Sequence, residues 1–263
     1  MAKIVIFTQN FKVTKLTAII PTKNEIDNIE AVIASVDFAD EIIVIDSYSE
    51  DGTAEKANTL ATKVIQREFD FYGAQKNHAI SQAQYEWILL VDADERVTPE
   101  LKTEILSVLS QDKIPHDAYN IKRINHFMGQ RVHYSGWRND SVIRLFKRDT
   151  CKYDDRHVHE ALKVNGTIGQ LKHKFLHYSY RSFDLYMQKM NHYANLQAKD
   201  YDKKTGRLTP YHFAIKPFWG FVKHYIVQSG FRDGLVGFTI GFVQAYVVFM
   251  RYVKLWLLRR NRN

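Results

Sequence analysis

Cysteine is almost absent from this sequence, which has one, Cys151, among 263 residues. A single cysteine excludes an intrachain disulfide framework and fits a reducing compartment. A secretory signal is also lacking, because the short apolar stretch at residues 4–7 is followed by polar residues and by no small-residue cleavage site. We therefore expect a protein that faces the cytosol.

Acidic residues are scarce in the C-terminal part of the chain. From Lys203 onward there are eleven Lys and Arg residues and one acid, Asp233, so the net charge of +8 is concentrated there. The same segment is rich in aromatic and apolar residues, a combination typical of binding to a membrane surface with anionic lipid. The sequence shows no nucleic-acid-binding module, so nucleic acid is not expected as a partner.

The first half of the chain alternates apolar runs with amphipathic stretches. Strands are predicted at 16–20, 41–45, 64–65 and 87–91, and helices at 26–36, after Asp51 and at 72–83. This alternation at short intervals indicates a parallel sheet with right-handed crossovers. The predicted fold class is α/β, a Rossmann-like, mostly parallel sheet with helices on both faces.

The second half of the chain follows a less regular pattern. After a helix at 99–109, strands in a partly antiparallel region are predicted at 119–124, 142–146 and 158–164. Further helices are predicted at 182–201 and within 210–260, where the last two are interrupted near 230–234.

Polar clusters follow three of the predicted strands, at 21–25, 46–53 and 92–95. Because ligands of such sheets bind beyond the carboxyl ends of the strands, the three clusters predict one site. In Asp92-Ala93-Asp94, two acids can place oxygens around a hard cation that bridges diphosphate oxygens. An Asp-x-Asp sequence is common in surface turns, but its position directly after the fourth strand favours a metal site.

The cluster at 21–25 offers polar groups to a nucleoside. Pro21 fixes the backbone as it leaves the strand, and Thr22 and Glu25 can bond to a ribose or base. The alternative is a proline turn in which Asn24 caps the next helix. Asp46, at the end of the second strand, can accept a hydrogen bond from a pyrimidine N–H.

Four motifs follow one another in this region: Pro-Thr-x-Asn-Glu at 21–25, Asp-Ser-x-Ser-x-Asp-Gly-Thr at 46–53, Gln-Lys-Asn at 75–77 and Asp-Ala-Asp-Glu at 92–95. In this order and spacing they resemble glycosyltransferase family 2, over roughly residues 16–180. The resemblance implies a GT-A fold, an inverting mechanism, a nucleotide-diphosphate sugar donor and Mg²⁺ or Mn²⁺ as cofactor. We therefore predict a nucleotide-sugar-binding catalytic domain at 1–180 and a helical region at 181–263 that associates with a membrane or another subunit.

Carried over by position, the resemblance implies roles for seven of these residues. Contacts to the nucleoside would come from Pro21, Thr22, Glu25 and Asp46. Lys76 would lie near the donor phosphate or ribose. Asp92 would lie near the ribose or the metal, and Asp94 would bind the metal.

An inverting transfer also needs a general base that takes the proton of the attacking hydroxyl. The best candidate region is Arg156-His157-Val158-His159-Glu160. It is similar to a family 2 subgroup with a Val-His-Glu element, which implies Glu160 as the base and His159 as a metal or phosphate contact. Two alternatives are that His157 and His159 bind zinc, although no zinc-site spacing accompanies them, or that they are ordinary polar strand residues.

Three more residues of the second half are candidate contacts for the donor phosphate or the acceptor, namely Trp137, Arg138 and Arg144. The planar guanidinium of an arginine can bind two oxygens of a diphosphate. Trp137 either stacks on an acceptor sugar or is a core aromatic residue.

The C-terminal helices contain sixteen consecutive uncharged residues, at 235–250. This is shorter than the ~20 residues of a membrane-spanning helix. Aromatic residues interleaved with Lys and Arg indicate a pair of helices lying on anionic lipid. The alternative is a helical hairpin packed on the catalytic domain or on another subunit, which would give a homo-oligomer.

A narrower resemblance is carried by Val-His-Glu at 158–160, a helix with Tyr186, Lys189 and Tyr193, and the basic, aromatic tail with Gly-Phe-Arg-Asp-Gly at 230–234. Together they resemble the lipopolysaccharide-core β-1,4-glucosyltransferase group. This implies UDP-glucose as donor, an inner-core heptose of a lipid-linked oligosaccharide as acceptor, and a peripheral location on the cytosolic face of the inner membrane. The alternatives are a family 2 enzyme acting on polyprenyl phosphate or on a capsule or exopolysaccharide acceptor, and a non-catalytic nucleotide-sugar-binding protein.

Overall fold

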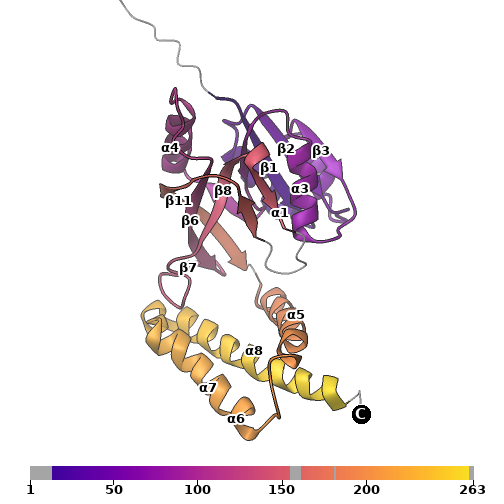
Figure 1. The fold of residues 1–263 in the computed structure, drawn as a ribbon, viewed down its shortest axis with the longest axis vertical. Coiled ribbons are helices and arrows are strands. Elements are labelled where there is room, and N and C mark those ends of the chain that lie inside the picture. The colour runs from indigo at the N-terminus through magenta and orange to yellow at the C-terminus, as the bar shows by residue number, and fades with distance from the viewer. Residues whose placement is uncertain (1–13, 155–160, 181, 261–263) are drawn as a thin grey trace, which may run out of the picture. The chain divides into compact units, whose positions relative to one another are not determined.

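The computed structural model describes residues 14–154, 161–180 and 182–260. The chain divides into two compact units, one of Met1–Arg123 and Ser141–Leu176 and the other of Ile124–Asp140 and His177–Asn263. The first unit holds a sheet covered by helices, and the second consists mainly of helices (Figure 1). The segment 124–140 therefore belongs with the C-terminal helices, although strands precede and follow it in the sequence.

Four parallel strands form one half of the sheet, in the order β3-β2-β1-β4. They are β1 (Leu16–Thr22), β2 (Glu41–Asp46), β3 (Lys63–Gln66) and β4 (Trp87–Leu90). All four lie where the sequence predicts strands, and their mutual pairings are parallel. Their carboxyl ends therefore meet at one edge of the sheet.

The sheet continues with antiparallel pairing beyond β4. Its other strands are β5 (Glu95–Val97), β6 (Ala118–Phe127), β7 (Gln130–Arg131), β8 (Ser141–Lys147) and β11 (Ile168–Tyr180). β8 pairs antiparallel with both β4 and β6. A separate antiparallel pair is formed by β9 (Cys151–Tyr153) and β10 (Leu162–Val164). The predicted antiparallel character of this half is confirmed, whereas the long strand β11 is not predicted by the sequence pattern.

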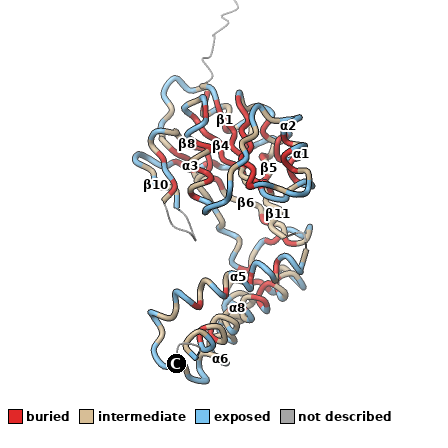
Figure 2. The backbone as a smooth tube through the Cα atoms, turned by 90° about the vertical axis from the view of Figure 1, so that its right-hand side faces the viewer, coloured by how far each residue is buried: buried red, intermediate tan, exposed pale blue. Residues whose placement is uncertain are grey.

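Helices cover both faces of the sheet. Successive side chains of a strand point to opposite faces, and β1 and β2 carry apolar side chains on both, so each face is buried by helices. The helices are α1 (Ile26–Ser35), α2 (Thr53–Asn58), α3 (Tyr72–Ser81) and α4 (Pro99–Leu109). Ile20 and Val44 share one core with α1, α2 and α4, and Ile19 and Ile43 share the other with α3. Figure 2 shows the buried strands at the centre of this unit. The predicted α/β class with helices on both faces is confirmed.

The second unit is built around the long helix α8 (Gly234–Arg260). α5 (Phe183–Asp202) and α7 (Ile215–Val222) both pack against it. Shorter elements complete the unit, namely α6 (Pro210–Phe213), η2 (Lys223–Val227) and η3 (Gly230–Asp233). The predicted interruption near 230–234 falls at η3 and is confirmed.

Asp233, in η3, joins the segment 124–140 to the helices of the second unit. Its carboxylate accepts hydrogen bonds from the backbone N–H groups of His133 (3.0 Å) and Tyr134 (2.9 Å) and from the hydroxyl of Ser135 (2.9 Å). The guanidinium of Arg232 lies over the Tyr134 ring, 4.4 Å from its centroid. The one acid of the basic C-terminal segment therefore has a structural role.

Gly237 and Gly241, one turn apart on α8, are expected to respond in opposite ways to alanine. A Cβ at Gly237 would lie 1.8 Å from the carbonyl oxygen of Gly230, so we expect Gly237→Ala to lower the free energy of unfolding by about 1–3 kcal/mol. A Cβ at Gly241 would meet its nearest neighbour, Tyr225 Cβ, at 3.4 Å. Gly241→Ala should therefore raise that free energy by about 0.5–1 kcal/mol through helix propensity. Urea unfolding measures both, and equal midpoints would contradict the close contact at Gly237.

Candidate active site

The carboxyl ends of β1 and β2 lie side by side, and their last residues, Thr22 and Asp46, are directly paired. Asp46 is completely buried, and Ser49 donates to its carboxylate from both its N–H (2.9 Å) and its hydroxyl. Thr22 is 6% exposed, and its hydroxyl has no hydrogen-bond partner among the described residues. A buried hydroxyl without a partner costs free energy unless a ligand or water satisfies it. This edge is therefore suited to a polar ligand.

Pro21 lies in β1 beyond the last residue pair that joins β1 to β4. Proline has no N–H and is tolerated where a strand leaves its neighbour. The chain then turns at Asn24, whose φ of 54° is left-handed, and α1 begins with Glu25 as its N-cap. The alternative prediction that Asn24 caps this helix is therefore wrong, and the Asn24 side chain accepts a hydrogen bond from the N–H of Glu50 (2.9 Å) instead.

Glu25 and Asp51 hold the starts of α1 and α2 together. The N–H of Glu25 donates to the Thr53 hydroxyl (2.9 Å), and its carboxylate accepts from the Asn28 side chain. Asp51 accepts from the N–H groups of Ile26 (3.1 Å) and Thr53 (3.1 Å). Burial raises the pKa of Asp51, but these hydrogen bonds outweigh it and leave the pKa below its ordinary value. The loops beside the ends of β1 and β2 are therefore fixed to each other.

Lys76, on α3, brings a buried positive charge to the end of β4. It is 6% exposed, and its Nζ lies 3.9 Å from a carboxylate oxygen of Asp92. The same Nζ lies 5.0 Å from the centroid of the Tyr153 ring. Burial raises the pKa of Tyr153, and the positive charges of Lys76 and Arg144 oppose that rise. An ammonium group in this position is suited to a phosphate group.

Asp92 and Glu95 flank the buried guanidinium of Arg144. Arg144 donates to the Asp92 carboxylate, and its Nη2 lies 3.3 Å from Oε1 of the fully buried Glu95. Arg123 Nη1 approaches the same Glu95 oxygen at 3.2 Å, and the Asp92 N–H donates to the other oxygen at 3.0 Å. Burial lowers the pKa of Arg144, but the negative charges of Asp92 and Glu95 outweigh it and raise the pKa well above its ordinary value. Arg144 therefore stays charged and fixes the orientation of Asp92.

The two acids of the Asp-x-Asp motif lie directly beyond β4, both partly exposed. Among the described residues, no group of three or more His, Cys, Asp or Glu side chains could hold a metal ion. Two carboxylates nevertheless fit Mg²⁺ or Mn²⁺, because Mg²⁺ is commonly held by one or two carboxylates together with substrate phosphates. Since Arg144 engages the carboxylate of Asp92, Asp94 is the stronger candidate ligand.

The predicted site residues fall into three groups. Those of the first unit lie at or near the carboxyl ends of β1, β2 and β4, namely Pro21, Thr22, Glu25, Asp46, Lys76, Asp92, Asp94 and Arg144. Trp137 and Arg138 belong to the second unit, where the partly buried Trp137 ring packs edge-on against Phe127, 6.1 Å between centroids, and also lines a cavity of that unit. His159 and Glu160 lie outside the described residues.

The sequence pattern misses the cluster of arginines around Glu95. Arg144 interrupts the apolar run of β8, whereas Arg123 lies in the mixed strand β6, and a charged residue within an apolar run is rarely buried unless it is paired. That interruption was the signal for a buried ion pair. The partners cannot be identified from the pattern, because Arg144 and Asp92 are 52 residues apart.

Comparisons with known proteins give relatives over most of the chain. The family model described as "Glycosyl transferase family 2" matches residues 17–165. An uncharacterized glycosyltransferase of Rickettsia typhi is 31% identical over 261 residues, which cover 95% of this chain and 89% of that protein. The lipopolysaccharide core biosynthesis glycosyltransferase LpsC of Rhizobium meliloti is 26% identical over 249 residues, 92% of each chain.

Among solved structures, S. aureus TarS in complex with UDP aligns with a TM-score of 0.48 and 17% sequence identity, over 94% of this chain and 92% of that one. The match to the family model covers more than half of the chain, and the Rickettsia protein matches nearly all of it. The chain belongs to glycosyltransferase family 2.

Proposed function

We propose that this family 2 glycosyltransferase transfers glucose from UDP-glucose, with inversion, to an inner-core heptose hydroxyl of a lipid-linked lipopolysaccharide precursor. The observation that carries the proposal is the polar edge beyond β1, β2 and β4. There the buried Asp46, the unpartnered hydroxyl of Thr22 and the buried Lys76 stand close to the Asp-x-Asp motif. The acceptor class is supported by the relative LpsC, whose name places that protein in lipopolysaccharide core biosynthesis.

In this proposal the nucleoside binds at the ends of β1 and β2. Pro21 would contact the nucleoside, and the Thr22 hydroxyl gains the partner that it otherwise lacks. The carboxylates of Glu25 and Asp46 accept hydrogen bonds from N–H or O–H groups of the base and ribose. The ammonium group of Lys76 lies near the donor phosphate or ribose.

The diphosphate is assigned to the region just beyond β4. Asp94, with Asp92 and His159, would hold Mg²⁺ or Mn²⁺, and the bound ion would supply positive charge to the departing diphosphate. Arg144 holds the Asp92 carboxylate in place. The remaining proposed contacts to the donor phosphate or the acceptor are Arg144, Arg138 and Trp137.

Glu160 is assigned as the general base. Its carboxylate takes the proton of the acceptor hydroxyl as that oxygen attacks the anomeric carbon of the sugar. The bond from the anomeric carbon to the diphosphate oxygen breaks at the same time, and its electron pair leaves with the UDP. Because attack and departure occur on opposite faces of the sugar, the configuration inverts.

UDP binding to the full chain, measured with and without Mn²⁺, tests the donor half of this proposal. We expect Mn²⁺ to tighten UDP binding, and Asp94→Asn to lose roughly tenfold or more of that metal-dependent affinity, because a carboxylate ligand is replaced by a neutral amide. Asp37→Asn, at an exposed ion pair with Lys102, is the control and should bind as the wild type does. A wild-type protein that binds no UDP, with Mn²⁺ or without it, would contradict the proposal.

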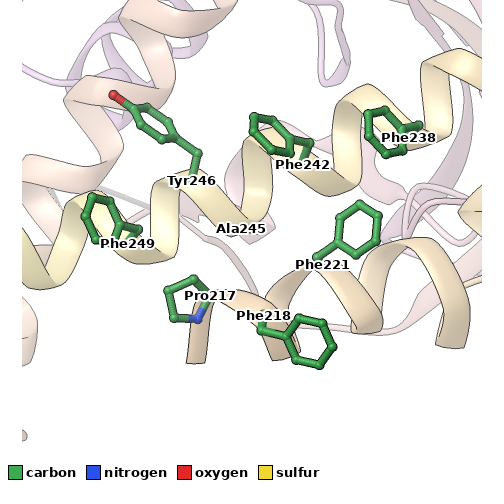
Figure 3. Close-up of a pocket in the computed structure, with 8 residues that line it drawn as sticks. All are labelled: Pro217, Phe218, Phe221, Phe238, Phe242, Ala245, Tyr246 and Phe249. Carbon is green, nitrogen blue, oxygen red and sulfur yellow. The ribbon is translucent and has the colours of Figure 1, made fainter. Parts of the chain in front are cut away.

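The same proposal places the second unit on the cytosolic face of the inner membrane. α7 and α8 present an apolar groove lined by Pro217, Phe218, Phe221, Phe238, Phe242, Ala245, Tyr246 and Phe249 (Figure 3). Phe218 is 65% exposed and Phe242 is 59% exposed, and an open apolar patch of this kind marks an interaction surface. Exposed basic residues at Lys223 and Arg260 would add attraction to anionic lipid.

Gly230–Arg260 is, by length and composition, apolar enough to cross a membrane, with 28% of its most apolar part buried in the protein. The core helix of a soluble protein can have the same length and apolar composition. These two properties are therefore compatible with a spanning helix, an interfacial helix or a core helix. We assign an interfacial position because α8 packs on α5 and α7 and still leaves large apolar side chains such as Phe242 exposed, as an interfacial helix requires. A homo-oligomer through the same face is the alternative.

Vesicle flotation tests the membrane assignment. The full chain should float with vesicles that contain phosphatidylglycerol and less with vesicles of phosphatidylcholine. Changing Phe218 and Phe242 together to serine should reduce binding more than tenfold, since burying each aromatic side chain contributes roughly 1.5–3 kcal/mol. Phe69→Ser, at an exposed phenylalanine of the first unit, is the control. If the double variant floats normally but sediments as a smaller species, the face is a subunit interface instead.

A further inference from the structure

The second unit contains a cavity of about 480 Å³ that the donor site does not use. It is lined by the segment 124–140, the end of β11, α5 and α8, all of which belong to that unit. Its volume lies within the range of roughly 300–1,000 Å³ that is usual for small-ligand pockets. The cavity is therefore large enough for a sugar ring.

Two buried polar atoms at the cavity wall lack a hydrogen bond. Tyr186 is completely buried, and its hydroxyl interacts with the Gln244 side chain without making a hydrogen bond of normal geometry, while the side-chain oxygen of Gln197 has no partner in the part of the chain that the structure describes. Burial raises the pKa of Tyr186 to about 12, against the lowering effect of the nearby Gln244 amide, so the hydroxyl remains a donor. A buried donor and a buried acceptor in this state cost free energy that a ligand would recover.

Another part of the wall is a chain of side chains that hold one another in place. The amide nitrogen of Asn125 donates to Asp140 (3.1 Å), and its amide oxygen lies 2.6 Å from Nδ1 of His177. Ser179 lies 3.0 Å from the same His177 nitrogen. Because these groups are already oriented, a ligand that bonds to them needs little reorganisation of the protein.

Aromatic rings complete the wall. The rings of Trp137 and Tyr180 lie 6.2 Å apart, and those of Tyr180 and Tyr186 lie 4.5 Å apart. A sugar ring presents an apolar C–H face that packs on such rings, and hydroxyls that both donate and accept hydrogen bonds. The combination of aromatic rings, an amide oxygen, a carboxylate and a hydroxyl therefore matches a saccharide.

We propose that this cavity binds a sugar residue of the saccharide acceptor. The identity of that saccharide rests on the proposed function, whereas saccharide binding by the cavity does not depend on donor binding. Tyr186 and Gln197 then act as positioning groups for the acceptor, with the Tyr186 hydroxyl donating and the Gln197 oxygen accepting. This gives the second unit a role in acceptor recognition as well as in membrane attachment.

The test is saturation-transfer NMR on the full chain with a deacylated inner-core oligosaccharide that contains heptose, and with UDP and the diamagnetic Mg²⁺ as the second ligand. Tyr186→Phe and Gln197→Met each remove one polar group and keep most of the side-chain volume. Each should raise the Kd for the oligosaccharide about three- to tenfold, the effect of one lost hydrogen bond, and leave the Kd for UDP unchanged. Tyr211→Phe, at an exposed tyrosine of α6, should change neither value.

The outcomes separate this inference from the proposed function. If the wild type does not bind the oligosaccharide, or if both cavity variants bind it as tightly as the wild type, the inference is wrong. If the wild type fails to bind UDP but binds the oligosaccharide through Tyr186 and Gln197, the proposed function is wrong and the saccharide site stands. In an active enzyme, the cavity variants should raise the KM for the acceptor without changing donor hydrolysis.

Discussion

Replacing Arg144 by methionine is expected to lower the free energy of unfolding by about 3–5 kcal/mol, the cost of removing one partner from a buried ion pair. Methionine keeps much of the side-chain length but leaves the fully buried Glu95 facing Arg123, whose Nη1 lies 3.2 Å away. Asp92 also loses the guanidinium that fixes its carboxylate, so UDP binding should weaken. Denaturant unfolding followed by circular dichroism measures the first effect, and UDP titration measures the second.

Two further variants separate the possible causes. Arg144→Lys keeps the charge but cannot present a planar fork to two carboxylates, so its loss of stability should be intermediate. Lys56→Met removes an exposed pair with Glu30 and should cost less than about 1 kcal/mol. If Arg144→Met is no less stable than Lys56→Met, the cluster around Glu95 does not stabilise the fold.

The stability difference at Arg144 should also persist as pH rises. Burial lowers the pKa of Arg144, but Asp92 and Glu95 raise it further, and the net shift is upward. A group whose pKa is raised on folding contributes its full stability below its unfolded pKa and loses it only as pH rises through the folded pKa. Arginine is strongly basic even when unfolded, so the contribution remains complete throughout the neutral and mildly alkaline range.

The sequence was sufficient to predict the elements whose signals are local. Three of the four parallel strands, β1, β2 and β4, are short apolar runs that end in polar clusters. α4 begins where Thr98 caps it and Pro99 occupies the first turn, which is a recognised start signal, and the predicted bounds of this helix are confirmed. Local patterns of this kind were enough to predict the edge of the sheet at which the candidate site lies.

β11 was not predicted because its pattern is mixed. Leu171 and Phe175 are buried in the first core, but Lys and His residues stand between them and hide the two-residue period of a strand. Strand pairing also lies outside the local pattern. The antiparallel register that pairs Leu89 with Leu145 brings Arg144 to the end of β4, and that register decides which carboxylates it meets.

The candidate site was likewise predictable only where its signals are local. Acids at strand ends identified Asp46 and Asp92, whereas the buried, unpartnered hydroxyl of Thr22 became visible only through the fold. The cavity of the second unit was hidden for a similar reason. Its walls come from the segment 124–140, β11, α5 and α8, which are far apart in the sequence.

Changing Glu160 to glutamine is expected to lower kcat about 10²- to 10⁴-fold, the usual contribution of a general base. Glutamine has nearly the same shape as glutamate but does not take up the proton of the acceptor hydroxyl. The affinity for UDP should remain unchanged, because the proposed nucleoside contacts come from β1 and β2. Steady-state transfer from UDP-glucose and UDP titration measure the two quantities, with the exposed Glu55→Gln as the control.

The result at Glu160 also decides between the acceptors. A hydroxyl acceptor needs a base, whereas the phosphate oxygen of a polyprenyl phosphate is already ionised and attacks without one. Full activity of Glu160→Gln would therefore show that the base assignment is wrong and would favour a polyprenyl phosphate acceptor. Loss of both turnover and UDP binding would instead assign Glu160 to the donor site. If the wild type binds UDP-glucose but transfers glucose to no acceptor, including water, the chain is a non-catalytic member of the family.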